Sequence, residues 1–119
     1  MFFNLKTIVC ALFAMGFVCN AMALEGNNLE KDMVLIDVRS IEEYNEGYLE
    51  GAINIPQGDI ETKIKDMVPS KDATLYVYCK SGRRASIAEE KLKNMGYTTI
   101  YNLGGIKDAE EKLNLPIIR

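Results

Sequence analysis

The chain has 119 residues, a formal net charge of −3 and no histidine. This length is enough for one compact domain with a modest core and too short for two. The acidic balance argues against nucleic acid or an anionic membrane surface as the main partner. The lack of histidine excludes catalytic Cys–His and Ser–His pairs and the usual histidine-containing zinc sites.

The first residues have the layout of a secretory signal peptide. Lys6 is followed by an apolar stretch over 7–18 and by a small-residue cleavage site ending at Ala23. We expect cleavage of residues 1–23, export to the periplasm, a loose leader over 24–31 and one domain over 32–119. The alternative, an uncleaved membrane anchor, needs ~20 apolar residues, which is more than this stretch supplies. No membrane association is therefore expected after cleavage.

The cysteine count becomes informative once the signal peptide is removed. Cys10 and Cys19 lie within it, so Cys79 is the one thiol of the predicted mature protein. Lipid attachment at Cys19 is disfavoured because Val18 precedes it, where a small residue is usual. No internal disulfide and no thiolate metal cluster is then possible. Structural cysteines in an oxidising compartment normally come in pairs, so a lone one is either reactive or buried and inert.

The predicted mature chain alternates between strand and helix patterns. Short apolar runs predict strands, whereas capping residues, helical spacing and closing glycines predict helices. A capping box of Ser40 and Glu43 indicates the start of the first helix, and Asp59 is expected to cap the second. The alternation predicts a single α/β domain with a mainly parallel central sheet flanked by helices. In chain order we expect a strand over 33–38, a helix over 41–46, a strand over 52–55, a helix over 60–67, a strand over 74–78, a helix carrying Ala85, Ala88, Leu92 and Met95 and stopping at Gly96, a strand over 98–102 and a helix over 106–113.

The third predicted strand leads into Cys79, a short loop with Gly82, and two arginines at the start of a helix. Backbone N–H groups of such a turn, arginines and a helix N-terminus all favour a thiolate. Sites in α/β sheets lie at the carboxyl ends of strands, so Cys79 is a candidate nucleophile activated by electrostatics. Asp37 ends another strand and is a possible rim residue. For Asp37 we favour the alternative, a structural pair with a nearby Lys or Arg.

Three ordered motifs resemble those of rhodanese domains, over about residues 32–116. The first signature of the family is resembled by Leu35 to Arg39, followed by Glu42-Glu43-Tyr44 and Glu50 to Pro56. The six-residue active-site loop is resembled by Cys79-Lys80-Ser81-Gly82-Arg83-Arg84. The second signature is resembled by Asn102-Leu103-Gly104-Gly105. The likeness is greatest to small periplasmic thiosulfate sulfurtransferases of the phage-shock type. Two departures are Tyr48, where many members have His, and Ala109, where many have Trp; both positions usually concern packing.

The resemblance implies a ping-pong sulfur transfer that needs no cofactor and no metal. Cys79 would take the outer sulfur of thiosulfate as a persulfide and pass it to cyanide or a small thiol. Backbone N–H groups of the loop would stabilise the persulfide anion, and Gly82 would let an anion approach closely. Arg84 would hold the loop, whereas Arg83 or Lys80 would attract the substrate. The alternative for both arginines is a solvated surface charge. The implied substrate-binding residues are Lys80, Ser81, Gly82, Arg83 and Arg84.

Two other classes of function stay open. Phosphatases and arsenate reductases also use a cysteine loop closed by arginine. Related phosphatases carry one more residue than the four that separate Cys79 from Arg84. A non-catalytic sulfur-carrier or binding module is the second alternative, although rhodanese domains of that kind can lack the cysteine that this chain keeps. We expect a monomer whose partners are thiosulfate and a thiol or cyanide acceptor.

Overall fold

The computed structural model describes residues 33–119; the predicted signal peptide and leader lie outside the described residues. At the centre is a four-stranded sheet in the spatial order β5-β3-β6-β7, and every neighbouring pair is parallel. The predicted α/β class with a parallel sheet is therefore confirmed. The strands are β3 (Met33–Asp37), β5 (Ile53–Asn54), β6 (Thr74–Cys79) and β7 (Thr99–Gly105).

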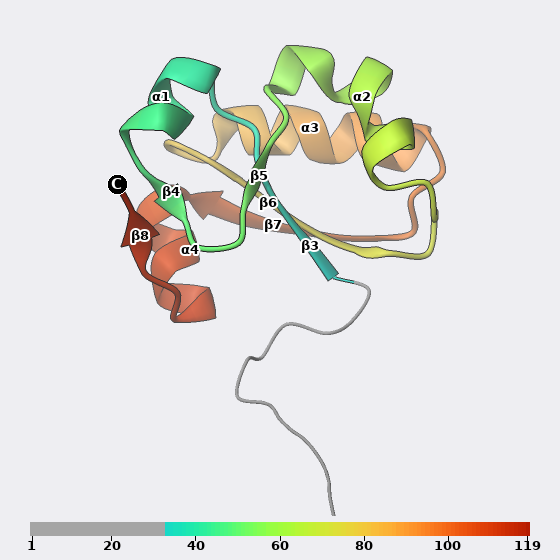
Figure 1. The fold of residues 1–119 in the computed structure, drawn as a ribbon. Helices are drawn as coiled ribbons and strands as arrows, with labels where there is room; N and C mark the ends of the chain where they lie inside the picture. The colour runs from blue at the N-terminus through green and yellow to red at the C-terminus, as the bar shows by residue number, and fades with distance from the viewer. Residues whose placement is uncertain (1–32) are drawn as a thin grey trace, which may run out of the picture. The chain divides into compact units, whose positions relative to one another are not determined.

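Helices cover both faces of this sheet (Figure 1). The helices α2 and α3 bury their apolar sides against one face, and α4 packs on the other with the short antiparallel pair of β4 (Tyr48–Leu49) and β8 (Ile117–Ile118). The helices are α1 (Ile41–Glu46), α2 (Ile60–Met67), α3 (Arg83–Asn94) and α4 (Ile106–Leu113), with a 3₁₀ turn, η1 (Gln57–Asp59), before α2. No helix in residues 33–119 is both long and apolar enough to cross a bilayer.

Alternation along β6 decides which way the cysteine points. Successive side chains of a strand face opposite sides of the sheet. Leu75, Val77 and Cys79 join the core beneath α2 and α3, whereas Tyr76 and Tyr78 belong to the core on the other face. The thiol thus lies on the face that α3 covers.

The four predicted strands of the sheet all end at other residues in the structure. β3 and β5 each end one residue earlier than expected, at Asp37 and Asn54. β6 includes Cys79 as its last residue, and β7 continues through Gly105 instead of ending at Asn102. Between the pairs Val77↔Asn102 and Cys79↔Gly105 the register shifts, because β7 carries an extra residue there. This bulge lets β7 follow β6 to the start of the cysteine loop.

The predicted cap at Asp59 is wrong. Asp59 stands at the N-cap position of α2, but its side chain accepts no helix N–H group. The 3₁₀ turn before α2 leaves Asp59 with φ −104° and ψ 2°, instead of the extended backbone that lets a cap side chain fold back. Its carboxylate lies 3.6 Å from the ammonium of Lys63. The capping box of Ser40 and Glu43 at α1 is confirmed.

Candidate functional site

Cys79 lies at the carboxyl end of β6, where the chain turns into α3. The residue is 1% exposed, and its Sγ accepts a hydrogen bond from the backbone N–H of Gly82, with a donor–sulfur distance of 2.8 Å. Burial in an apolar core would suit an inert thiol. A backbone N–H directed at the sulfur is instead an arrangement that favours negative charge on it. The loop is therefore shaped around the sulfur atom.

Gly82 makes this loop possible through its backbone. Its φ of 103° lies in the left-handed region, which residues with a side chain rarely adopt. The same residue is the N-cap of α3, whose first turn has no side-chain cap. The unpaired N–H groups of that turn and the positive end of the helix dipole adjoin the loop that holds Cys79. The backbone alone thus directs hydrogen-bond donors toward the sulfur.

Arg84 ties the first turn of α3 to α1. Its Nη1 donates to Glu43 Oε1 at 2.7 Å and its Nη2 donates to Glu43 Oε2 at 3.1 Å. Such a two-pronged pair fixes the orientation of the guanidinium as well as its distance. The first turn of α3, which follows the cysteine loop directly, is therefore joined to α1 through Glu43.

Glu43 is fixed from its other side by the start of α1. Its Oε1 accepts hydrogen bonds from the backbone N and the hydroxyl of Ser40, at 3.1 and 3.0 Å. The hydrogen bonds from Arg84 lower the pKa of Glu43 to about 2, with further help from Ser40 against the effect of burial. The carboxylate stays ionised at neutral pH and is a permanent anchor for Arg84.

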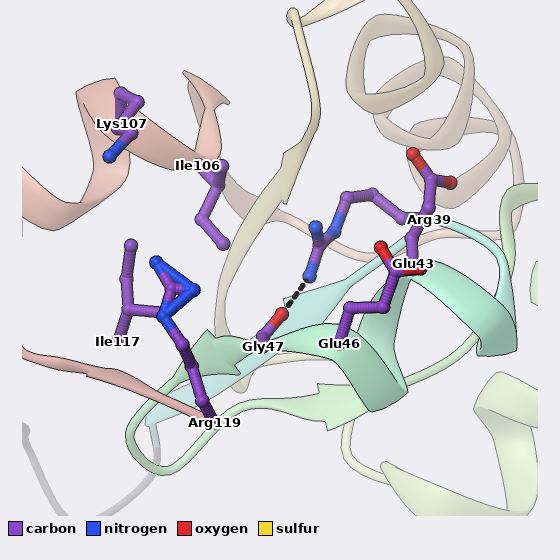
Figure 2. A pocket seen from close by; sticks show the side chains of 8 residues that line it. All are labelled: Arg39, Glu43, Glu46, Gly47, Ile106, Lys107, Ile117 and Arg119. Atoms are coloured by element: carbon purple, nitrogen blue, oxygen red, sulfur yellow. Dashed lines mark hydrogen bonds between the residues drawn. The ribbon is translucent and has the colours of Figure 1, made fainter.

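Asp37 belongs to a separate buried pair. Arg39 donates to its carboxylate from Nε, at 3.0 Å, and from Nη2, at 2.7 Å. Nη2 also donates to the carbonyl of Gly47 at 2.5 Å. Burial acts to lower the pKa of Arg39, but the hydrogen bonds and charge of Asp37 outweigh it and raise that pKa. The pair of Asp37 and Arg39 thus fixes the backbone at Gly47, between α1 and β4, and Figure 2 shows the bond from Arg39 to that backbone.

The double glycine at the end of β7 lets the loop lie against the start of α4. A Cβ atom on Gly105 would overlap the carbonyl oxygen of Lys80 and crowd Ser81. Asn102 braces the same region, because its Oδ1 accepts from Gly104 N at 2.9 Å and its Nδ2 donates to Ser86 Oγ at 3.1 Å. The segment from Asn102 to Gly105 therefore packs against the cysteine loop at Lys80 and Ser81.

The candidate residues fall into three groups in the structure. Cys79, Gly82 and Arg84 come together at the loop and the first turn of α3. Lys80, Ser81 and Arg83 are exposed on the loop and the helix start, and Asp37 is buried in its ion pair with Arg39. The sequence placed Glu43 in a helix cap and in the first rhodanese signature, but it did not predict the bond from Arg84. The two are 41 positions apart, and no local signal reports that contact.

The two positions that depart from the rhodanese pattern are packing positions here. The ring of Tyr48 stacks on Tyr44, with 4.3 Å between ring centroids. Ala109 is fully buried in the core beneath α4. Neither side chain forms part of the loop around Cys79.

Comparisons with known proteins agree with this geometry. The family described as Rhodanese-like domain matches residues 22–112. Thiosulfate sulfurtransferase PspE from Escherichia coli is 47% identical over 73 residues, which are 61% of this chain and 70% of PspE. A putative mitochondrial thiosulfate sulfurtransferase from Schizosaccharomyces pombe is 38% identical over 87 residues, and the match covers 64% of this chain and 61% of that protein.

A solved structure, a rhodanese with anions from E. coli, superposes with a TM-score of 0.67 at 40% identity and covers 73% of this chain and 98% of that one. The match to the family extends over most of the sequence, and the solved rhodanese shares the parallel sheet and its helices. The chain belongs to the rhodanese-like domain family.

Proposed function

We propose that this protein is a thiosulfate sulfurtransferase that carries sulfur as a persulfide on Cys79. The observation that carries the proposal is the hydrogen bond from the N–H of Gly82 to Sγ, at the uncapped start of α3. Two relatives named as thiosulfate sulfurtransferases support the choice of reaction. A non-catalytic module would have no need of a thiol held in this way.

The first half of the reaction uses the thiolate of Cys79. Sγ attacks the outer sulfur of thiosulfate, an S–S bond forms, and the S–S bond within thiosulfate breaks. Sulfite leaves with the electron pair of that bond. In the second half, cyanide or a thiolate attacks the outer sulfur of the persulfide, and Cys79 leaves as the thiolate. No external oxidant or reductant is required.

The surrounding groups have distinct roles in this proposal. Backbone N–H groups of residues 80–84 stabilise the persulfide anion, in the loop conformation in which the Gly82 N–H already donates to Sγ. Arg84 acts as a positioning residue, because its guanidinium is held by Glu43. Lys80 and Arg83 are exposed, and their charges attract the thiosulfate dianion to the loop.

Intact mass spectrometry tests the proposal directly. Incubation with thiosulfate, without an acceptor, should add one sulfur atom to the wild-type protein and none to the Cys79→Ser variant. Subsequent cyanide should remove the added sulfur and yield thiocyanate. Equal sulfur addition to both proteins would contradict a persulfide on Cys79.

Export and a monomeric state complete the proposal. Protein isolated from a Gram-negative host should be periplasmic and begin at or near Leu24. Soluble cytoplasmic protein that begins at Met1 would contradict export. The exposed large apolar side chains of residues 33–119 are Ile41, Met67, Ile87 and Tyr101. They are scattered over α1, α2, α3 and β7, which supports a monomer. Sedimentation at several concentrations checks the monomeric state.

A further inference from the structure

A series of side-chain hydrogen bonds runs from the end of β7 across to the cysteine loop. Gly104 N donates to Asn102 Oδ1 at 2.9 Å, and Asn102 Nδ2 donates to Ser86 Oγ at 3.1 Å. Ser86 Oγ in turn donates to the carbonyl oxygen of Gly82 at 3.1 Å. This series from Gly104 to Gly82 is called the relay below. It ends on the residue whose N–H donates to the sulfur of Cys79 at 2.8 Å.

The partners fix the direction of every bond in the relay. A backbone N–H can only donate, so Gly104 must face the oxygen of the Asn102 amide, and the nitrogen then faces Ser86. A carbonyl can only accept, so the one hydroxyl proton of Ser86 points at Gly82. All three bonds therefore run the same way, and hydrogen bonds aligned in this manner strengthen one another.

Gly82 depends on these bonds for the orientation of its backbone. A glycine has no side chain to restrict it, and its φ of 103° is one of many angles that it can adopt. Its carbonyl accepts from Ser86 twice, from the backbone N at 3.0 Å and from Oγ at 3.1 Å. Ser86 therefore holds the carbonyl side of the same residue that binds Sγ through its N–H.

Asn102 joins β7 to α3 at the level of the loop. Its Oδ1 holds Gly104, and Gly104 lies close enough to Gly82 that a Cβ on Gly82 would be 3.5 Å from the Gly104 Cα. Its Nδ2 also donates to Glu89 Oε1 at 3.3 Å, so both of its N–H groups have acceptors. The amide thus acts on Gly82 from two directions, through Gly104 and through Ser86.

We propose that Asn102 and Ser86 are positioning residues for sulfur transfer, which direct the Gly82 N–H at the sulfur carried by Cys79. Neither residue belongs to the cysteine loop itself. The inference rests on the proposed sulfurtransferase function and adds to it a device on β7 and α3. A donor that is already oriented stabilises charge on the sulfur without reorganisation during the reaction. The relay should therefore affect the rate of sulfur uptake more than the binding of thiosulfate.

Single-turnover release of sulfite measures that rate. Asn102→Ala and Ser86→Ala should each lower the maximal rate about fivefold, the equivalent of the ~1 kcal/mol that one neutral hydrogen bond contributes. The thiosulfate concentration that gives half the maximal rate should stay the same. The double variant should be no slower than Asn102→Ala, because the two residues act in series. Multiplied losses in the double variant would overturn the relay.

Conservative variants separate the relay from a loss of packing. Ser86→Thr keeps a hydroxyl that can bond the carbonyl four residues back in a helix, and it should retain the wild-type rate. Asn102→Asp keeps the size of the side chain and the acceptor for Gly104, but its second oxygen would draw the hydroxyl proton of Ser86 away from Gly82. Asn102→Asp should therefore be at least as slow as Asn102→Ala.

A matched control lies at the other end of α3. Asn94 is an exposed amide there, and Asn94→Ala should keep the wild-type rate. Ser86 is exposed and Asn102 half-buried, so the variants should remain folded, which thermal unfolding checks. A wild-type rate in Ser86→Ala or Asn102→Asp would overturn the proposal. A loss in Ser86→Thr as large as that in Ser86→Ala would also overturn it.

A measurement on the resting protein keeps this inference separate from the sulfurtransferase proposal. Without thiosulfate, the amide NMR signal of Gly82 should move in Ser86→Ala and stay near its wild-type position in Ser86→Thr. Its proton should also exchange faster with solvent in Ser86→Ala. An unchanged Gly82 signal in Ser86→Ala would overturn the relay. Failure of thiosulfate to load wild-type Cys79 would instead contradict the sulfurtransferase proposal and leave the NMR comparison valid.

Discussion

The guanidinium of Arg84 and the carboxylate of Glu43 form two hydrogen bonds, of 2.7 and 3.1 Å, that join the first turn of α3 to α1. Arg84 stands at the closing position of the cysteine loop, and Glu43 is fixed in turn by Ser40 at the start of α1. The end of the loop is therefore linked to α1 by a contact between residues that are 41 positions apart in sequence.

Replacement of Arg84 should impair sulfur transfer strongly. Arg84→Ala is expected to lower kcat/KM for thiosulfate by roughly 10²-fold, because a misplacement of the reacting groups by ~1 Å can cost about that much. Arg84→Lys keeps the charge but loses the two-pronged geometry, and it should remain impaired. Arg83→Ala is the neighbouring comparison and should mainly raise KM, because an exposed charge steers the substrate. Near-normal turnover by Arg84→Ala would show that the loop does not need this contact.

The ion pair also predicts how stability depends on pH. The pKa of Glu43 is lowered from 4.5 to about 2 in the folded protein. Its stabilisation is thus present above pH 4.5 and is lost as the pH falls toward 2. The side chains of Arg84 and Glu43 are 35% and 28% exposed, so solvent screening keeps the effect modest.

Urea unfolding of the wild type and of Glu43→Gln measures this contribution. The difference in unfolding free energy should be constant above pH 4.5 and should shrink between pH 4.5 and pH 2. Glu42→Gln is the matched control on the same helix, since Glu42 is exposed. A Glu43→Gln difference that does not change across this window would show that the ion pair does not stabilise the fold.

Much of the fold could be predicted because its local signals are strong. The bounds of α1 and α4 agree with the expected helices over 41–46 and 106–113. Short apolar runs likewise located β3, β5 and β6, and helical spacing located α3. The antiparallel pair of β4 and β8 was not predicted, because each strand has two residues and neither shows a period. These two strands form only because the tertiary fold brings Tyr48 and Leu49 beside Ile118 and Ile117.

The candidate site could be predicted only where it is local. Cys79, Gly82 and the start of α3 are contiguous, so sequence alone indicated a backbone cradle for sulfur. Non-local contacts were out of reach, and the one between Glu43 and Arg84 spans 41 positions. The bond from Arg39 to the carbonyl of Gly47 was not predicted either, because it depends on how α1 brings Gly47 back beside Arg39. The sequence motifs thus predict Cys79 as the nucleophile, whereas the contacts around its loop are visible only in the tertiary structure.

Gly82→Ala should lower thiosulfate turnover by more than its loss of stability explains. An alanine at φ 103° costs about 1 kcal/mol in backbone strain, which corresponds to roughly 4–8 °C in Tm for a domain of this size. Its Cβ would meet the Cα of Gly104 at an ordinary 3.5 Å, so relief must come from the backbone. The expected shift moves the Gly82 N–H away from Sγ and lowers thiosulfate turnover.

Gly51→Ala is the control for this strain. Gly51 has φ 88° with open space around its Cβ position, and it lies in the turn between β4 and β5. Both alanine variants should lose similar Tm in thermal unfolding, and only Gly82→Ala should lose turnover. Equal loss of activity in both would mean that the effect comes from lower stability and not from the loop.

Loop geometry also separates sulfur transfer from phosphate chemistry. Four residues lie between Cys79 and Arg84, and the Gly82 N–H is already bonded to Sγ at 2.8 Å. A loop closed this tightly suits one added sulfur and leaves little room for a tetrahedral anion. The wild type should therefore turn over thiosulfate and leave p-nitrophenyl phosphate unhydrolysed.

Insertion of one glycine between Ser81 and Gly82 provides the complementary measurement. The longer loop should lose thiosulfate turnover, because the Gly82 N–H no longer meets Sγ. Inorganic phosphate should not inhibit the wild type at concentrations where sulfite, the product released from the loop, does. Thermal unfolding of the insertion variant checks that α3 still packs on the sheet. Robust phosphatase activity in the wild type, or full thiosulfate turnover by the insertion variant, would contradict the proposal that loop size selects sulfur over phosphate.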